Sequence, residues 1–281
     1  MAANMSPFES RVARDQCGSA LEAKQRKKLL ATWDSAIERR AANWRIIREK
    51  ERQSIYQPQL DFVSGTCEFT AFLAHQIRNT KGEKGAKKRL DPRIPYYGSK
   101  FYPPTYVSEK LRKVSPNVTP ELSYLKPVTV LHPALIEELN FCPRCNATGS
   151  DLSWNGWTTS GPRDVHGVSS EEQVIRVQMR CNKCKAARGK ADANDDDEDP
   201  SYCWGTASSQ FWENKEHWQI PIGVPHVKWR SAVTSELYDL IVELRPDATS
   251  AGLAEHIKQL HLLEYHKRRR QYLANFEARA N

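Results

Sequence analysis

Hydrophobic residues in the N-terminal part of the chain recur at steps of three and four positions, with basic residues mostly between them. The recurring positions are Leu30, Trp33, Ile37, Ala41, Trp44 and Ile47. This spacing lines one side of a helix, so we predict one long helix over residues 19–53 that ends at Gln57-Pro58. The apolar stripe is narrow, which predicts that the helix packs on the main body or on a partner protein. A second helical pattern covers residues 67–78.

A stretch rich in Gly and Lys follows over residues 79–93, and prolines stand at positions 92 and 95. Such a composition is typical of a linker, because glycine and proline interrupt helices and strands. We therefore predict a basic N-terminal helical region with its linker over residues 1–93, and a cysteine-rich domain over residues 94–281.

Short strands are predicted on both sides of the first cysteine pair. One covers residues 126–131, and three more cover residues 152–157, 163–168 and 174–180, with Gly, Ser and Pro turns between them. In the last strand the positions alternate: Ile175, Val177 and Met179 are apolar, whereas Arg176, Gln178 and Arg180 are polar. Alternation with a period of two predicts one buried face and one polar, basic face.

Two helices are predicted after the cysteine region. Thr234 is a start signal for a helix over residues 234–244, and Pro246 marks its end. Thr249 or Ser250 caps a last helix that runs to about residue 278. The side of that helix expected to be buried carries Leu253, Ile257, Leu260, Leu262, His266, Leu273 and Phe276.

Four of the seven cysteines form two CxxC units, Cys142-Pro-Arg-Cys145 and Cys181-Asn-Lys-Cys184. Two residues between paired cysteines let a tight turn aim both sulfurs at one point, and two such turns supply the four thiolates that structural Zn²⁺ prefers. We therefore predict a structural zinc site with Cys142, Cys145, Cys181 and Cys184 as ligands. A redox pair or free thiols are the alternatives. His132 and Cys203 are candidates for a supporting or substitute ligand.

Together these elements predict an α+β fold. Its centre is expected to be a small antiparallel sheet of the zinc-ribbon kind with flanking helices, the long N-terminal helix and the C-terminal helices. We expect no enzyme. Four thiolates leave a metal ion no open position, no His-x-Glu pair accompanies the cysteines, and no Gly-rich phosphate loop occurs in the sequence.

The formal net charge of +8 and a pI near 9.1 favour polyanionic partners. Positive charge concentrates in the N-terminal half, whereas residues 192–199 are almost entirely acidic. The residues predicted to contact phosphates are Arg144, Arg163, Arg176, Arg180, Lys183 and Lys185 around the cysteines, and Lys87, Lys88 and Arg89 in the linker. The alternative is that these charges form only solvated surface.

Several segments occur in an order that resembles a known domain family. They are Tyr97-Gly-Ser-Lys-Phe-Tyr-Pro-Pro, Val128-Thr-Val-Leu-His-Pro, Phe141-Cys-Pro-Arg-Cys, Asn155-Gly-Trp157 with Pro162-Arg163, and Arg180-Cys-Asn-Lys-Cys. Over residues 95–275 the chain resembles a cysteine-rich domain of fungal proteins that is similar to the zinc ribbon of transposase-like, mobile-element proteins. The resemblance implies that the four paired cysteines are metal ligands. The acidic insert after Lys190 departs from the family pattern, and no nuclease region follows Asn281, so no catalytic role is carried over.

We expect a zinc-stabilised module of mobile-element origin that binds nucleic acid, with DNA favoured, and that is not catalytic by itself. The main alternative is a protein–protein interaction module. Residues 141–205 carry eight basic and ten acidic residues, and the aromatic side chains Trp154, Trp157, Trp204 and Trp212 suit a partner surface. The N-terminal helix is another candidate partner surface. A transposase or nuclease that lacks its catalytic domain is the third interpretation.

The sequence also bears on location. No apolar run reaches the roughly 18 residues that a membrane-spanning helix needs, and the first residues do not resemble a secretion signal. We therefore expect no membrane partner and an intracellular location, in the nucleus.

Overall fold

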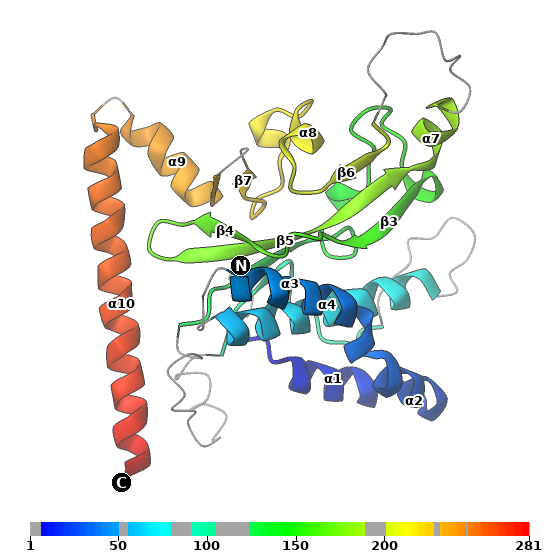
Figure 1. The fold of residues 1–281 in the computed structure, drawn as a ribbon, viewed down its shortest axis with the longest axis horizontal. Coiled ribbons are helices and arrows are strands. Elements are labelled where there is room, and N and C mark those ends of the chain that lie inside the picture. Colours follow the sequence, from blue (N-terminus) through cyan, green and yellow to red (C-terminus); the bar gives the residue numbers. More distant parts are fainter. Residues whose placement is uncertain are drawn as a thin grey trace.

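The structure is a computed structural model that describes residues 7–50, 56–79, 91–104, 124–188, 201–227, 231–245 and 247–280. A curved sheet forms its centre, helices α1 to α4 lie against one face, and the long helix α10 stands at one end (Figure 1). The predicted phosphate contacts Lys87, Lys88 and Arg89 and the acidic tract 192–199 lie outside the described residues.

The N-terminal region forms several helices, so the prediction of one helix over residues 19–53 is wrong. The helices are α1 (Ser10–Ser19), α2 (Ala23–Thr32), the 3-10 turn η1 (Asp34–Ala36), α3 (Glu38–Lys50) and α4 (Tyr56–Asn79). One continuous helix would bury only its narrow stripe, whereas the folded-back chain lets α1 contact α2 and α4, and α3 contact α4. Pro58 lies in the first turn of α4, where a missing N–H costs little, so it belongs to a helix start and not to a stop.

Within the described ranges the sheet contains eight strands, which is more than a zinc ribbon has. They are β1 (Lys100–Phe101), β2 (Val128–Leu131), β3 (Leu152–Trp157), β4 (Arg163–His166), β5 (Glu171–Cys181), β6 (Cys203–Gly205), β7 (His226–Val227) and β8 (Ala232–Val233). Six follow the order β1-β2-β5-β4-β8-β7, while β3 and β6 also pair with β5. The pairs β2–β5 and β4–β8 are parallel. The protein is therefore α+β, and its sheet is mixed. The prediction of a small antiparallel zinc-ribbon sheet is wrong.

Strand β5 is the centre of this sheet. Its first half pairs with β2 and β4, and its second half pairs with β3 and β6. The predicted alternation is present: Ile175, Val177 and Met179 are buried, Arg176 and Arg180 are half-buried, and Gln178 is exposed. The strand thus contributes apolar side chains to the core on one face and basic side chains on the other.

Helices and sheet share one hydrophobic core. Phe8 lies at its centre, with its ring 5.0 Å from that of Phe101 on β1 and 5.6 Å from that of Phe69 on α4. Trp33 belongs to the predicted N-terminal region and Ile175 to the predicted cysteine-rich domain, yet both belong to the same cluster of buried residues. The division at residue 93 itself stays a prediction.

The two C-terminal helices, α9 (Ser235–Leu244) and α10 (Ser250–Ala280), confirm the predicted elements. Thr234 caps α9, because its Oγ1 accepts a hydrogen bond of 3.2 Å from the Leu237 N–H. The expected buried side of α10 is wrong, since its exposed residues include Leu260, Leu262, His266, Leu273 and Phe276. The helix stands beside the turn between β4 and β5, where the His261 ring contacts the Gly167 carbonyl at 2.9 Å (Figure 1).

None of the helices in the described ranges combines the length and the apolar character needed to cross a membrane.

Candidate metal centre

The first cysteine pair lies on a tight loop that follows the 3-10 turn η2 (Glu137–Leu139). Within this loop the Cys142 N–H donates to the Ala147 carbonyl at 2.8 Å, and the Asn146 N–H donates to the Cys142 carbonyl at 2.9 Å. Asn146 has φ of +53°, the left-handed conformation that asparagine adopts more readily than most residues with a side chain. The neighbouring Phe141 ring lies 5.0 Å from Phe211 of helix α8 (Ser209–Trp212), which anchors the loop to the core.

The second pair is held differently, at the junction between β5 and the short helix α7 (Asn182–Arg188). Cys181 is the last residue of β5, opposite Leu152 of β3, and its N–H donates to the Tyr202 carbonyl at 2.9 Å. The Cys184 N–H donates to the Cys181 sulfur at 3.5 Å. Both cysteine positions are therefore fixed by the backbone of the sheet and of the first helical turn.

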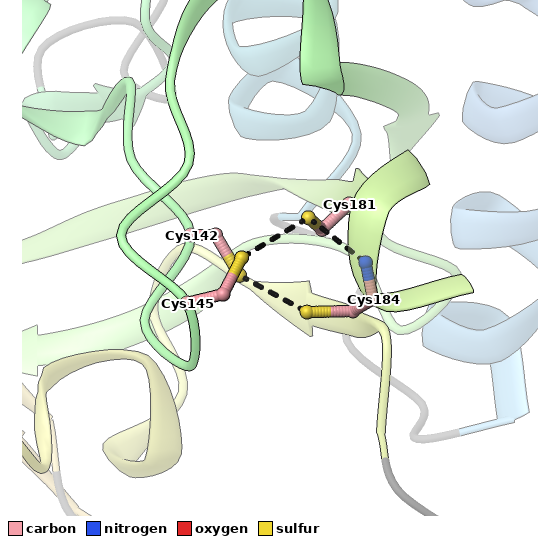
Figure 2. Close-up of side chains that lie close together, drawn as sticks. All are labelled: Cys142, Cys145, Cys181 and Cys184. Carbon is pink, nitrogen blue, oxygen red and sulfur yellow. Dashed lines mark hydrogen bonds between the residues drawn. The ribbon is translucent and has the colours of Figure 1, made fainter. Parts of the chain in front are cut away.

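The four sulfurs converge on one point (Figure 2). All lie within 4.8 Å of one another, and the Cys142–Cys184 and Cys145–Cys181 sulfur distances are each 3.7 Å. A disulfide needs about 2.05 Å, and all these cysteines are free. In a tetrahedral ZnS₄ centre with Zn–S near 2.3 Å, neighbouring sulfurs are about 3.8 Å apart. The cluster is close enough to bind a metal ion, and these two separations fit a tetrathiolate shell.

Burial makes this cluster an unfavourable place for thiolates without a cation. It raises the pKa of Cys142 and of Cys184. At the less buried Cys145, burial also acts upward, but the Ala147 N–H and the three neighbouring thiols together hold the pKa below its usual range. Four thiolates cannot gather here unless a metal cation offsets their charge, so metal binding and proton release are coupled at this site.

Neither candidate for a supporting or substitute ligand joins the cluster. The His132 ring is buried, with Nδ1 accepting a hydrogen bond of 3.0 Å from the Ala134 N–H, and it lies 5.8 Å from the Trp157 ring. Cys203 lies on β6 opposite Arg180 of β5. Among the residues that the structure describes, the group of possible metal ligands therefore consists of the four paired cysteines.

The predicted phosphate contacts occupy three places. Arg144, Lys183 and Lys185 are exposed beside the cysteine cluster. Arg163 of β4 and Arg176 of β5 line one cavity, which is described below. The Arg180 guanidinium lies 5.5 Å from the centre of the Tyr202 ring, and that of Arg188 lies 5.4 Å from it.

Sequence reasoning missed Arg188 and Tyr202. Tyr202 stands just before the three-residue strand β6, which is too short to show a periodic pattern. No Phe, Tyr or Trp lies between Trp157 and Tyr202, so the sequence around the second cysteine pair carries no local signal of this stacking arrangement.

The tryptophans expected on a partner surface are mostly inside the protein. Trp157, Trp204 and Trp212 are buried, and Trp154 is half-buried. The Trp212 indole N–H donates to the Thr206 carbonyl at 2.9 Å, so its polar edge is satisfied internally. These residues pack the core around the central strand, and the expected exposed aromatic surface is wrong.

Comparisons of this chain with protein-family models, with curated proteins and with solved structures found no match. The resemblance to the fungal transposase-associated domain stays a prediction from its motifs.

Proposed function

We propose that this protein is a zinc-stabilised module that binds nucleic acid, with DNA as the favoured form, and that performs no catalysis by itself. One observation carries the proposal. The four-cysteine cluster lies at the end of β5, and the polar face of the same strand carries Arg176 and Arg180. A metal bound there would fix the strand that presents these guanidiniums.

Zinc is the proposed ion because of the donor set. Four thiolates in a tetrahedral shell are the usual environment of structural Zn²⁺, and such a shell leaves no open position for a substrate. Since an unfolded chain has no preformed site, the free energy of ligation would add directly to the stability of the region around β5.

Phosphate recognition is proposed because of the basic residues and their chemistry. Arginine offers a planar fork of donors that matches phosphate oxygens, and the net charge of +8 favours encounter with a polyanion. The exposed Lys183 and Lys185 on α7 would add contacts next to the metal centre. A mobile-element origin and a location in the nucleus belong to this proposal, on the strength of the motif order and the basic sequence.

Two measurements test the proposal on the full chain. The metal content of the natively purified protein should be one zinc ion per chain. Binding of a fluorescently labelled DNA duplex, followed by anisotropy, should weaken about 100-fold between about 50 and 200 mM salt if roughly four phosphate contacts form. Replacement of Arg180 by Ala should weaken binding and lower the salt slope by about one. The matched control is Lys258→Ala, which removes one exposed charge from α10.

Two outcomes would overturn the proposal. One is a protein that holds no metal and stays folded. The other is an affinity for nucleic acid that does not change with salt, because phosphate contacts would then not be the main source of binding. A parallel titration with single-stranded RNA shows which form of nucleic acid is preferred.

Protein–protein interaction is the second candidate, and the exposed apolar residues of α10 favour it. Leu263 is 65% exposed, and Leu262, Tyr265 and Phe276 are each close to half exposed. Such side chains on one helix suit contact with another protein. Concentration-dependent self-association that Leu263→Asp abolishes, together with salt-independent and weak binding of nucleic acid, would favour this function over the first.

A further inference from the structure

A cavity of about 260 Å³ opens over the junction of β4 and β5. Its lining consists of Ser160, Gly161, Pro162, Arg163, Asp164, Val174, Arg176 and Ala207. The lining therefore comes from the turn before β4, from β4 and β5 themselves, and from Ala207, which follows β6 by two positions. Its volume equals that of about nine water molecules in the liquid, which is room for a small polar group and part of the molecule to which that group is attached.

Two guanidiniums share this cavity. Arg163 stands opposite Val174 in the register of β4 and β5, and Arg176 is two residues further along β5. Side chains that are paired, or two apart on one strand, point to the same face of a sheet. Both arginines therefore project on the face that Val174 shares, and their convergence is a consequence of strand register.

The Arg176 guanidinium is held in one position beside Gly205 of β6. A Cβ atom added to Gly205 of β6 would lie 2.8 Å from Arg176 Nη1 and 3.1 Å from its Cζ. The guanidinium thus lies against the backbone of β6, at a position where a side chain would displace it. No ion pair or hydrogen bond of its side chain joins it to the residues described in the structure.

The rim of the cavity is rigid. The Thr158 N–H donates to the Arg176 carbonyl at 3.1 Å, and the Thr158 carbonyl accepts from the Trp44 indole N–H at 3.0 Å. Gly161 has φ of +79°, and a Cβ atom added to it would lie 3.1 Å from Cδ1 of the Trp44 ring. The turn that bounds the cavity is therefore held from α3, so the two arginines face a preformed space.

The charges of the cavity favour an anion. Burial lowers the pKa of Arg176, and the positive charge of Arg163 lowers it further, so the two cations repel each other in a partly dry place. Arg163 donates to the Ser231 carbonyl at 3.1 Å, which is a neutral acceptor. The carboxylate of Asp164 accepts from Lys126 Nζ at 3.0 Å and from Gln173 Nε2 at 3.1 Å. Lys126 Nζ also donates to Glu171 Oε2 at 2.6 Å, so Arg163, Arg176 and Lys126 together face the two carboxylates of Asp164 and Glu171 and leave an excess of positive charge.

We propose that this cavity is a binding site for a phosphate monoester, and specifically for the terminal phosphate of a nucleic-acid strand. The source of the phosphate rests on the proposed function, whereas the anion site rests on the two guanidiniums. A monoester carries nearly two negative charges at neutral pH and matches two arginines, whereas an internal phosphodiester carries one. A monoester also has a single substituent, so the attached molecule leaves the cavity in one direction, whereas the strand continues in two directions from an internal phosphodiester.

The first test needs no variant. Binding of one short oligonucleotide is compared in three forms: with a 5′-phosphate, with a 3′-phosphate, and with hydroxyl ends and two additional nucleotides, which supply about the same extra charge internally. One of the terminal phosphates should raise affinity about tenfold over the hydroxyl form at a fixed salt concentration, as expected for charge-assisted hydrogen bonds to two arginines. Equal affinities of all three forms would overturn the assignment to strand ends.

The second test moves the arginine without removing its charge. Gly205→Ala should displace the flexible Arg176 side chain and abolish the preference for a terminal phosphate, while overall salt dependence stays as in the wild type. Arg176→Gln should abolish the preference as well. Arg180→Ala is the control, since it should weaken all three oligonucleotides equally.

Inorganic phosphate distinguishes the two sources of the ligand. It should raise the melting temperature of the wild type more than chloride does at equal ionic strength, and this difference should be lost in Gly205→Ala. Stabilisation by phosphate without any preference among strand ends would support the anion site and assign it to a small phosphate monoester. If neither effect appears, the site is wrong, whereas salt-dependent DNA binding would still support the proposed function.

Discussion

The sulfurs of Cys142 and Cys184 lie 3.7 Å apart, although the two residues are separated by 42 positions of sequence. The intervening chain contains β3, β4 and the whole of β5. A metal bound between the two CxxC pairs would therefore close a long loop around the central strand, and closing such a loop restricts the unfolded chain. With a metal bound, this relationship would make the cluster a stabilising element for the sheet.

Replacing Cys184 by Ser should remove one thiolate from a buried shell. We expect the affinity for zinc to fall by at least about 100-fold, because even changes outside the ligand shell cost 10- to 100-fold. The midpoint of urea unfolding should fall with it, since ligation energy at such a site is folding energy. The zinc-to-protein ratio measured by mass spectrometry, together with the unfolding curve, checks both effects.

The matched control for this change is Cys203→Ser. Cys203 is half-buried on β6 and lies outside the four-cysteine group, so the variant should keep its full metal content. A loss of metal in this control equal to that of Cys184→Ser would contradict the assigned ligand set.

Substitutions of Asn146 test the geometry of the loop that carries Cys142 and Cys145. The φ of +53° at Asn146 disfavours a side chain with an ordinary Cβ, at a cost of about 1–2 kcal/mol. Asn146→Ala should therefore lower the free energy of unfolding by about 1 kcal/mol in zinc-saturated buffer, whereas Asn146→Gly should match or exceed the wild type. Equal losses in both variants would instead indicate that the asparagine side chain makes the contribution.

Sequence patterns predicted the elements with clear periodicity. The alternation of Ile175, Val177 and Met179 identified β5, and Thr234 marked the start of α9. The wider sheet was missed because β1, β7 and β8 are two residues long, too short for any period to show. The parallel pairing of β2 with β5 was missed because it joins distant segments, and a local pattern carries no record of its partner.

The four-cysteine cluster was predictable because metal-binding chemistry requires fixed local spacing. Cys142 with Cys145, and Cys181 with Cys184, each form a unit that any fold must present as a turn. The cavity was only half predictable. Arg163 and Arg176 were recognisable as basic residues, but their meeting depends on the register between β4 and β5 and on the absence of a side chain at Gly205.

Gly161 should be far less tolerant of substitution than Gly98. Both have positive φ, +79° and +75°, so an alanine strains the backbone at either position. At Gly161 the new Cβ would also press on the Trp44 ring at 3.1 Å, whereas nothing lies within 4 Å at Gly98. We expect Gly161→Ala to cost about 1–3 kcal/mol more than Gly98→Ala in urea unfolding. Equal costs would show that the Trp44 contact is not constraining.

Glu68 of α4 should make the protein less stable as pH rises. It lines a cavity of about 470 Å³ together with Trp33 and His75, and burial raises its pKa to about 7, with the charge of Asp34 acting in the same direction. Its ordinary value is 4.5. Between these two values the folded state holds a proton that the unfolded state has released, so stability falls as pH rises through this window.

Glu68→Gln isolates this effect, because the amide is neutral at every pH and has nearly the same shape. The variant should be more stable than the wild type at pH 8, and this advantage should shrink or vanish near pH 5, where the wild-type carboxyl is protonated in the folded state. Urea unfolding of both proteins at each pH gives the difference directly, and the titration of other groups, including the thiols of the four paired cysteines, cancels between them. An advantage of the same size at both pH values would mean that side-chain packing, and not ionisation of Glu68, causes it.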